Sequence, residues 1–459
     1  MPVLPTPGFQ LQPSADQVPL ATNYITNFDF LNQYLPDTYE KEFERYGNRT
    51  VSSFLRMVGA EMPSNSDLVK WAEQGRLHTK YTGVTVGAPG TTATLTVPGA
   101  QFTTGIAIRN GQTVALVDEA GAGLNKAIVS NVNSTAGTFD IATYDAVGVG
   151  AGPVTVFIYG SEFNKGTNGM QGSLEAEDEI FDNKPIILKD KYSVNGSDMA
   201  QIGWVEVTTE NGATGYLWYL KSEHETRLRF DDYLETAMIE AVPAEVGSGA
   251  IATVTGSEGI FHTVGLRGNV WGAGTPATLA DWDTIISRLD NQGAIEENVV
   301  FLDRNFGFDV DDMLAAQNSY GVGGTSYGLF DNDEDMALNL GFTGFRRGYD
   351  FYKTDWKYLN DPTMRGGLPT GAGSGRVNGL LVPAGSTTVY DQVLGKNAKR
   401  PFLHVRYRAS QTEDRRYKTW ITGSAGGAAT SDLDAMEVNF LSERCVCTMG
   451  ANNFFLFQE

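Results

Sequence analysis

The sequence contains few of the residues that catalytic and metal-binding sites commonly use. Among 459 residues there are four histidines and two cysteines. No two histidines stand at zinc-ligand spacing, and neither an H-E-x-x-H helix nor a G-x-x-x-x-G-K-[ST] phosphate loop occurs. No stretch approaches the ~18 apolar residues of a membrane span, and MPVLPTPGF lacks the regions of a signal peptide. We therefore expect no enzymatic activity, no cofactor, no metal site and no membrane partner.

Basic residues are also scarce. Lys and Arg number 34 against 55 Asp and Glu, which gives a net charge of −21. A surface of this charge is repelled by a phosphate backbone, so we expect only loose, non-specific contact with nucleic acid. The two cysteines, Cys445 and Cys447, are one residue apart, a spacing that seldom allows disulfide geometry. We predict two reduced thiols on one face of a strand.

One long helix is the most ordered feature of the sequence. Residues 215–242 contain no Gly or Pro after Gly215, and Pro243 ends the segment. A step of about 100° per residue gives two apolar stripes, so the helix needs two covering surfaces. One surface can be its own sheet, and the other can come from the same subunit or from a neighbour. The first stripe holds Leu217, Leu220, Leu228, Met238 and Ile239, and the second holds Tyr219, Phe230, Tyr233 and Ala237.

Elsewhere the sequence predicts short helices and many strands. Ser66 precedes a helical pattern, LVKWAEQGRLH, and Thr278 with Asp281 forms a capping box before another helix. Residues 81–160 carry few charges and alternate in short runs, which predicts a small all-β module. The stretches KPIILKDKYSV and QIGWVEV flank Asn195-Gly196 and predict a long hairpin arm. Asp309 is expected to begin a short helix.

Three clusters carry candidate chemistry. The G-x-S-x-G match at 324–328 lacks the strand and helix of a nucleophile elbow, so we expect a loop. The acids at 331, 333 and 335 lack the glycine and the glutamate of a calcium loop. The third cluster is basic and is either a solvated face or a patch that faces another subunit or nucleic acid; it comprises Arg406, Arg408, Arg415, Arg416 and Lys418.

The order of these parts resembles the major capsid protein of tailed bacteriophages, the Hong Kong 97-type fold. The segments that carry the resemblance are FLNQYLPDTYEKEFERYG through WAEQGRLH, the predicted hairpin, the long helix, and MEVNFLSERCVCTMGANNFFLF near the C-terminus. The N-terminal stretch is similar to that of crAss-like phage capsid proteins. The resemblance covers about four fifths of the chain, and the module at 81–160 departs from the minimal fold.

The resemblance implies an α+β fold with five parts. They are an N-terminal arm with helices at 1–80, an inserted all-β domain at 81–160, and an extended hairpin loop at 161–213. A peripheral domain with the spine helix would cover 214–256 and 437–459, and an axial domain would cover 257–436.

The function that the resemblance implies is structural and not enzymatic. The chain would self-assemble into hexamers and pentamers of an icosahedral phage head enclosing double-stranded DNA. It would meet portal and head decoration proteins, be assembled in the host cytoplasm, and reside in the virion. The candidate inter-subunit contacts are Tyr219, Phe230, Tyr233, Lys189, Lys191, Arg406 and Arg408.

A different class of protein remains as the alternative. A β-rich, glycine-rich chain can also be a carbohydrate-binding protein or a depolymerase. Its acid and base would then be a pair of carboxylates, either Asp231 with Asp232 or Asp309 with Asp311.

Overall fold

The computed structural model has a mixed α+β fold in two compact units. It describes residues 60–76, 78–121, 123–172, 178–200, 207–208, 214–215, 218–250, 254–293, 295–317, 343–371, 373–391, 396–425 and 429–459. The helices predicted between residues 37 and 59 lie outside these ranges. The described part of unit 1 comes from Leu188–Leu234 and Tyr417–Ser442. The described part of unit 2 comes from the rest of the chain.

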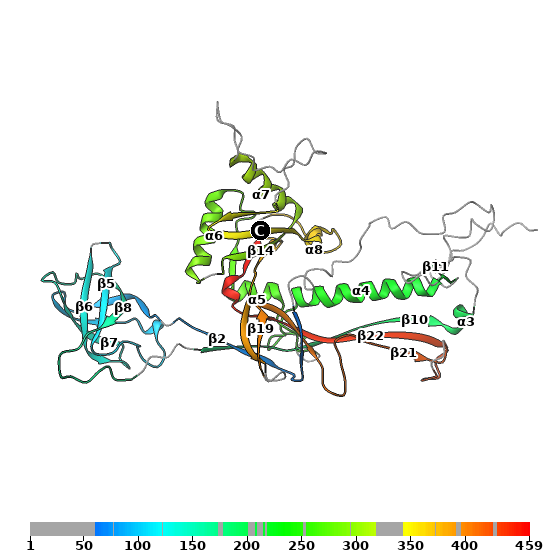
Figure 1. Cartoon of the computed structure of the whole chain (residues 1–459), viewed down its shortest axis with the longest axis horizontal. Helices are drawn as coiled ribbons and strands as arrows, with labels where there is room; N and C mark the ends of the chain where they lie inside the picture. Colours follow the sequence, from blue (N-terminus) through cyan, green and yellow to red (C-terminus); the bar gives the residue numbers. More distant parts are fainter. Residues whose placement is uncertain are drawn as a thin grey trace, which may run out of the picture. The chain divides into compact units, whose positions relative to one another are not determined.

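Unit 1 is a helix laid on a small sheet. The predicted long helix is present as α4 (Trp218–Glu240). Strand β22 (Ala435–Thr448) pairs antiparallel with β21 (Lys418–Gly423) and lies beside β10 (Ile186–Asn195). Figure 1 shows α4 along one face of these strands. The core between the two layers consists of Phe230, Leu234, Met436, Val438 and Phe440. A short helix, α3 (Gly196–Met199), and a two-stranded ladder of β11 (Val207–Thr208) with β12 (Thr214–Gly215) complete the described part of the unit.

Unit 2 contains a six-stranded mixed sheet. Its strand order is β13-β23-β17-β14-β16-β15. The core is aromatic, and Trp282 lies edge-on to Phe345 and Phe351 with ring centroids 4.8 and 5.1 Å away. The elements are α5 (Ile260–Arg267), β13 (Asn269–Trp271), α6 (Leu279–Asn291), β14 (Glu297–Leu302), α7 (Arg304–Gln317), β15 (Gly344–Arg347), β16 (Tyr349–Asp355), α8 (Lys357–Asn360), β17 (Val377–Pro383) and β23 (Phe455–Gln458).

The predicted capping box of α6 is confirmed. The hydroxyl of Thr278 accepts a hydrogen bond from Asp281 N at 3.3 Å, and Thr278 N donates to the Asp281 carboxylate at 3.1 Å. These two bonds satisfy backbone donors that the first turn of a helix leaves unpaired. Trp282, Ile285 and Leu289 then follow at helical spacing and are buried, as the sequence pattern indicates.

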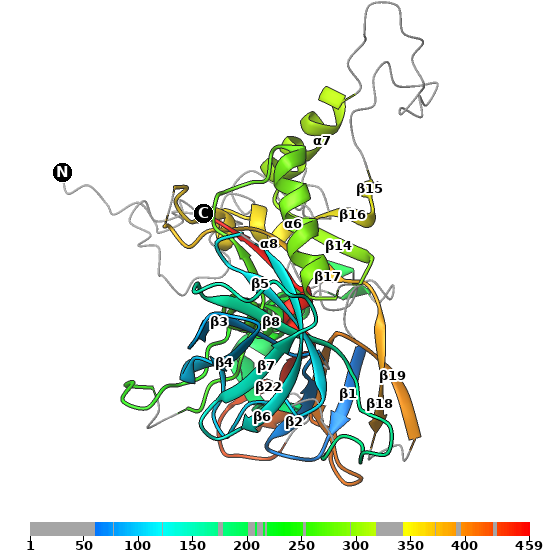
Figure 2. The same cartoon turned by 90° about the vertical axis from the view of Figure 1, so that its left-hand side faces the viewer.

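Residues 80–161 form a closed barrel. Its six strands are antiparallel, in the order β3-β4-β7-β6-β5-β8. Because β8 returns beside β5 after three hairpin-connected strands, these four make a Greek key. Figure 2 shows the barrel from its side. The interior is filled by small and branched side chains around Phe139. The strands are β3 (Lys80–Val86), β4 (Thr92–Thr96), β5 (Gln112–Asp118), β6 (Leu124–Asn133), β7 (Thr138–Thr143) and β8 (Val154–Ser161).

Short ladders flank the barrel and β22. Strand β2 (Val69–Gln74) pairs antiparallel with β9 (Asp178–Asn183), on either side of the barrel in sequence. Strand β1 (Ala60–Ser64) runs parallel to β20 (Leu403–Arg408), and β20 pairs antiparallel with the last residues of β22. A separate hairpin joins β18 (Ser386–Asp391) to β19 (Lys396–Pro401). Cys445 and Cys447 are both buried on β22, and neither takes part in a disulfide.

Three predictions of local structure are wrong. The segment after Ser66 is strand β2, because its pairing with β9 outweighs a helical pattern of only two or three apolar residues. Asn195-Gly196 does not form a two-residue turn, because the chain enters α3 there. Residues 201–206, in the second strand predicted for the hairpin, lie outside the described ranges. Helix α7 begins at Arg304 and not at Asp309, because Asp303 accepts a hydrogen bond from Phe306 N at 2.7 Å.

Candidate assembly surfaces

Strand β10 has one face turned to the helix of unit 1. Leu188 and Tyr192 pack against the core around Phe230, and Asp190 bonds to Arg229 of α4. Successive side chains of a strand point to opposite faces. Lys189 and Lys191 therefore lie on the other face, where both are exposed.

The same alternation defines a second sheet face, which no element in the described part of the chain covers and which we call the open face. Lys191 Nζ binds the Glu437 carboxylate at 2.9 Å, and Asn439 donates to the Thr422 hydroxyl at 3.0 Å. Trp420 lies opposite Asn439 in the ladder, and the ammonium of Lys418 is 5.7 Å from its ring centroid. The open face thus combines polar pairs with an aromatic ring; its members are Lys189, Lys191, Trp420, Thr422, Glu437 and Asn439.

Strand β21 exposes apolar side chains on both of its faces. Trp420 on the open face is 36% exposed, and Ile421 on the other face is 47% exposed. Within the described residues β21 pairs only with β22, so its other edge is unpaired. An unpaired edge with exposed apolar side chains is a template for pairing with another chain. Trp420 and Ile421 were not among the predicted contacts, although the alternation of side chains along β21 could have indicated them.

The aromatic residues of α4 have different environments. Phe230 is fully buried, with ring centroids 5.4 Å from Tyr417 and 5.8 Å from Phe440. Its ring therefore cannot reach a neighbouring subunit, which corrects its place among the candidate contacts. Tyr233 is 49% exposed and remains available for such a contact. The side chain of Tyr219 lies outside the described residues.

The four arginines of the basic cluster belong to unit 2, where three of them pair with carboxylates, and Lys418 lies on β21 of unit 1. Arg415 lies 2.8 Å from Glu443, which Arg408 also contacts at 3.5 Å. Arg408 further binds Asp67, which raises the pKa of its guanidinium. Arg416 and Arg444 both bind Glu61. Arg406 contacts the sulfur of Met62 at 3.8 Å. The cluster is thus mainly an internal ion-pair network and not a free basic patch for nucleic acid.

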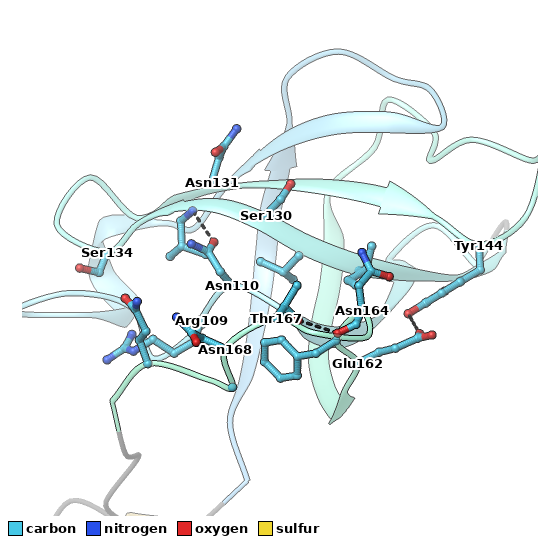
Figure 3. A pocket seen from close by; sticks show the side chains of 17 residues that line it. Arg109, Asn110, Ser130, Asn131, Ser134, Tyr144, Glu162, Asn164, Thr167 and Asn168 are labelled. Atoms are coloured by element: carbon cyan, nitrogen blue, oxygen red, sulfur yellow. Dashed lines mark hydrogen bonds between the residues drawn. The ribbon is translucent and has the colours of Figure 1, made fainter.

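A groove lies on the barrel, where three segments meet. They are the turn before β5, a bulge in β6, and the chain that follows β8. Figure 3 shows that Asn131 and Ser130 come from one strand, while Asn164, Thr167 and Asn168 come from the segment after β8. The lining is rich in amides and hydroxyls. The groove was not anticipated as a site from the sequence.

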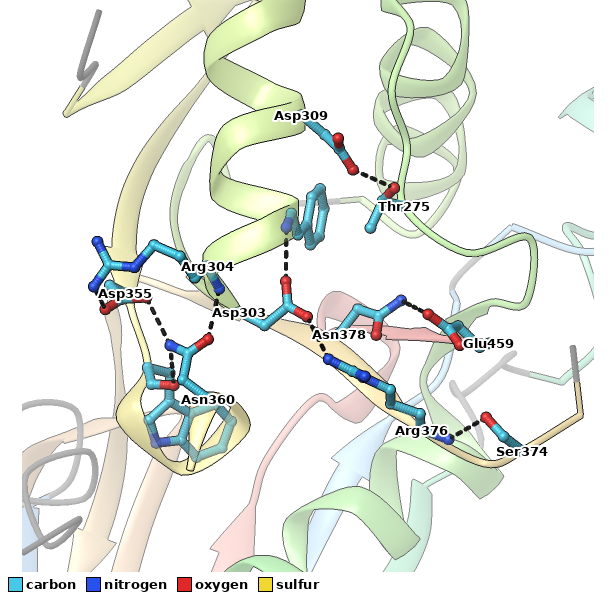
Figure 4. Close-up of polar contacts among 12 residues, drawn as sticks. Thr275, Asp303, Arg304, Asp309, Asp355, Asn360, Ser374, Arg376, Asn378 and Glu459 are labelled. Carbon is cyan, nitrogen blue, oxygen red and sulfur yellow. Dashed lines mark hydrogen bonds and ion pairs between the residues drawn. The ribbon is translucent and has the colours of Figure 1, made fainter. Parts of the chain in front are cut away.

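The carboxylates proposed for acid–base chemistry in unit 2 are engaged in structural contacts. Asp309 accepts a hydrogen bond from Thr275 at 2.7 Å, and Asp311 pairs with Lys353 at 2.5 Å. In Figure 4, Asp303 lies between the start of α7 and Arg376, whose guanidinium is 3.2 Å from it. Burial raises the pKa of Asp303, although the bonds from Phe306 N and Arg376 oppose that shift.

The described residues contain no group of three His, Cys, Asp or Glu side chains placed to hold a metal ion. No helix in this part of the chain is both long and apolar enough to cross a membrane. The motifs at 324–328 and 331–335 lie outside the described residues.

Comparisons with solved structures return structures of phages, of the capsid of a GTA particle and of an encapsulin complex. A Microbacterium phage Oxtober96 structure is 10% identical at a TM-score of 0.41 and covers 95% of this chain and 99% of its own. The capsid of a native GTA particle is 8% identical at a TM-score of 0.41, and the match covers 95% of this chain and 99% of that one. An encapsulin complex from Synechococcus elongatus is 8% identical at 0.38 and covers 94% of both chains. No protein-family model matches the sequence, and no curated protein matches it.

Proposed function

We propose that the chain is a major capsid protein that self-assembles into hexamers and pentamers of an icosahedral phage head enclosing double-stranded DNA. The observation that carries the proposal is the edge of β21 that has no partner strand among the described residues, with Trp420 and Ile421 exposed on the two faces of this strand. Soluble monomers usually protect such edges with charges, bulges or covering segments. Contact with a further copy of the chain would cover this edge in an assembly.

The build of unit 1 supports the same function. One helix covers one face of its sheet, and the open face bears the exposed Lys189 and Lys191. A thin two-layer unit buries little apolar surface within one subunit, so neighbours would supply part of its stability. Among the inter-subunit contacts predicted from the sequence, we propose Tyr233, Lys189, Lys191 and Arg406. Arg408 would contribute mainly to ion pairs within its own subunit.

The proposed parts follow the resemblance stated for the sequence. The barrel would be the inserted domain, 161–213 the extended loop, and α4 the spine of the peripheral domain. Residues 257–436 would form the axial domain. Portal and head decoration proteins would be further partners, in a virion assembled in the host cytoplasm. The net charge of −21 suits a container whose wall must not hold DNA tightly.

Electron microscopy and sedimentation of the purified full chain test this proposal. We expect closed shells, or capsomers with fivefold and sixfold symmetry. A compact monomer that persists at high protein concentration would contradict the proposal.

A pair of variants locates the contact. Ile421→Asp places a charge on the exposed edge and should reduce assembly without loss of secondary structure. Leu124→Asp is the control, because Leu124 is 59% exposed on the barrel and lies away from unit 1 in sequence. If both variants assemble equally well, the exposed edge of β21 is not a contact between subunits.

A further inference from the structure

The groove on the barrel has the size of a binding site for several sugar rings. Its volume is about 1100 Å³. The Asn110-Gly111 turn, the β6 bulge and residues 162–171 contribute its walls. All of these belong to unit 2, and the inference does not depend on shell formation.

Phe163 gives the groove a flat apolar surface. Its side chain is 40% exposed, although it follows β8 in a polar segment. The ring lies against Gly111, where an added Cβ would come within 2.4 Å of a ring carbon. Gly111 also has φ of +83°, a conformation that favours glycine. The ring therefore packs closely against the backbone at Gly111, and 40% of the side chain remains exposed.

Amides and hydroxyls are frequent in the lining of the groove. Asn131 has φ of +47° at the bulge of β6, and its side chain donates to Asp140 at 3.0 Å. Left-handed backbone in a residue other than glycine is uncommon and is often retained at functional sites. Asn164 and Asn168 are exposed on the segment after β8, where Thr167 bonds back to the Asn164 carbonyl at 2.7 Å. An amide offers both donors and acceptors, which matches the hydroxyls of a sugar.

The charged side chains of the groove are already engaged. The Tyr144 hydroxyl donates to Glu162 at 2.5 Å, as Figure 3 shows, and burial together with this bond raises the pKa of Tyr144 to about 12. Arg109 donates to the carbonyls of Ile106 and Ile108 at 2.9 and 3.0 Å. The two charged side chains of the lining, Arg109 and Glu162, have opposite signs and both have protein partners, which favours a neutral ligand.

We propose that the barrel groove binds a neutral oligosaccharide. A sugar ring would stack its apolar C–H face on Phe163, and its hydroxyls would exchange hydrogen bonds with the amides of Asn164 and Asn168. Aromatic side chains with one apolar face and polar surroundings suit such amphipathic ligands, and Asn and Ser provide adaptable hydrogen bonding. A nucleic-acid strand would instead need unpaired basic residues along the groove.

A glycan array probed with the full chain, followed by calorimetric titration of the neutral oligosaccharides that bind best, tests this site. We expect Phe163→Ala to weaken binding by about tenfold, the scale of one aromatic contact. Phe157→Ala is the matched control, because Phe157 is also 40% exposed on β8 but does not line the groove. The double variant Asn164→Ala, Asn168→Ala lies in exposed chain and should weaken binding without affecting the barrel fold.

Three outcomes would overturn the proposal. One is the absence of binding to any neutral oligosaccharide at millimolar concentration. Another is equal loss of binding in the Phe163 and Phe157 variants while the double variant binds normally. The third is a preference for polyanions such as heparin fragments or single-stranded DNA. Glycan binding is measured by array and calorimetry, whereas assembly is measured by electron microscopy. The failure of this proposal can therefore be distinguished from the failure of the capsid proposal.

Discussion

Arg229 of α4 and Asp190 of β10 form a two-point ion pair, with Nε and Nη2 at 3.0 and 3.2 Å from the two carboxylate oxygens. The pair ties the long helix to the strand that the sequence predicts as the first half of a hairpin arm. The neighbouring Leu188 and Tyr192 pack in the same direction. At least the first half of the predicted arm is therefore part of the folded unit.

We predict that Arg229→Met loosens β10 more than it lowers the stability of the whole chain. The Arg229 side chain is 51% exposed, so the pair should contribute ~1 kcal/mol or less to the free energy of unfolding. Hydrogen exchange of residues 186–195 should become faster, as measured by mass spectrometry. Arg229→Lys keeps the charge without the two-point geometry and should have an intermediate effect. Unchanged exchange in both variants would show that core packing alone holds the strand.

Phe230→Ala should destabilise unit 1 strongly. The ring is fully buried between Tyr417 and Phe440, and removal of such a side chain typically costs ~3–5 kcal/mol. Chemical unfolding should show this loss, whereas Tyr233→Ala should change the free energy of unfolding by ~0.5 kcal/mol or less. Comparable losses in the two variants would contradict the burial difference.

Tyr233→Asp should leave the subunit folded and block assembly. The side chain is 49% exposed on α4, so a charge there is solvated in the isolated subunit but would be buried in an inter-subunit contact. Circular dichroism checks the fold, and electron microscopy checks the particles. Normal particles would show that Tyr233 is not a required contact.

Asp303 should make stability fall as pH rises through its raised pKa. The native state then holds this proton at pH values where the unfolded chain has lost it, so protonation favours the native state. Asp303→Asn removes the titration. The free energy of unfolding of the wild type, relative to that of Asp303→Asn, should therefore decrease between pH 4 and pH 7, by at most ~1.4 kcal/mol per pH unit. A constant difference across this range would indicate an unshifted pKa.

Elements whose start, end and periodicity are all marked in the local sequence could be predicted from the sequence alone. Residues 218–240 contain no Gly or Pro, and the Thr278–Asp281 box carries its own hydrogen bonds, so both helices were predictable. The strand pattern of the barrel was also readable, because alternation reports which side of a strand is buried.

The remaining features depend on distant partners. Strand β2 forms because β9, more than a hundred residues away, pairs with it. Phe230 and Tyr233 fall on one predicted stripe, yet only the sheet beneath α4 decides that one ring is buried and the other exposed. The groove beside Phe163 likewise needs the turn at Gly111 and the bulge at Asn131 to come together in space.

The ladder of β2 with β9 places Gln74 directly opposite Asp178, and the barrel occupies the chain between them. The barrel's own first and last strands, β3 and β8, are also paired. The chain therefore enters and leaves the barrel at adjacent positions. Because these two ends are close together, the barrel could be gained, lost or exchanged without changing the path of the surrounding chain. For engineering, it marks the position at which a foreign domain with closely spaced ends could be displayed.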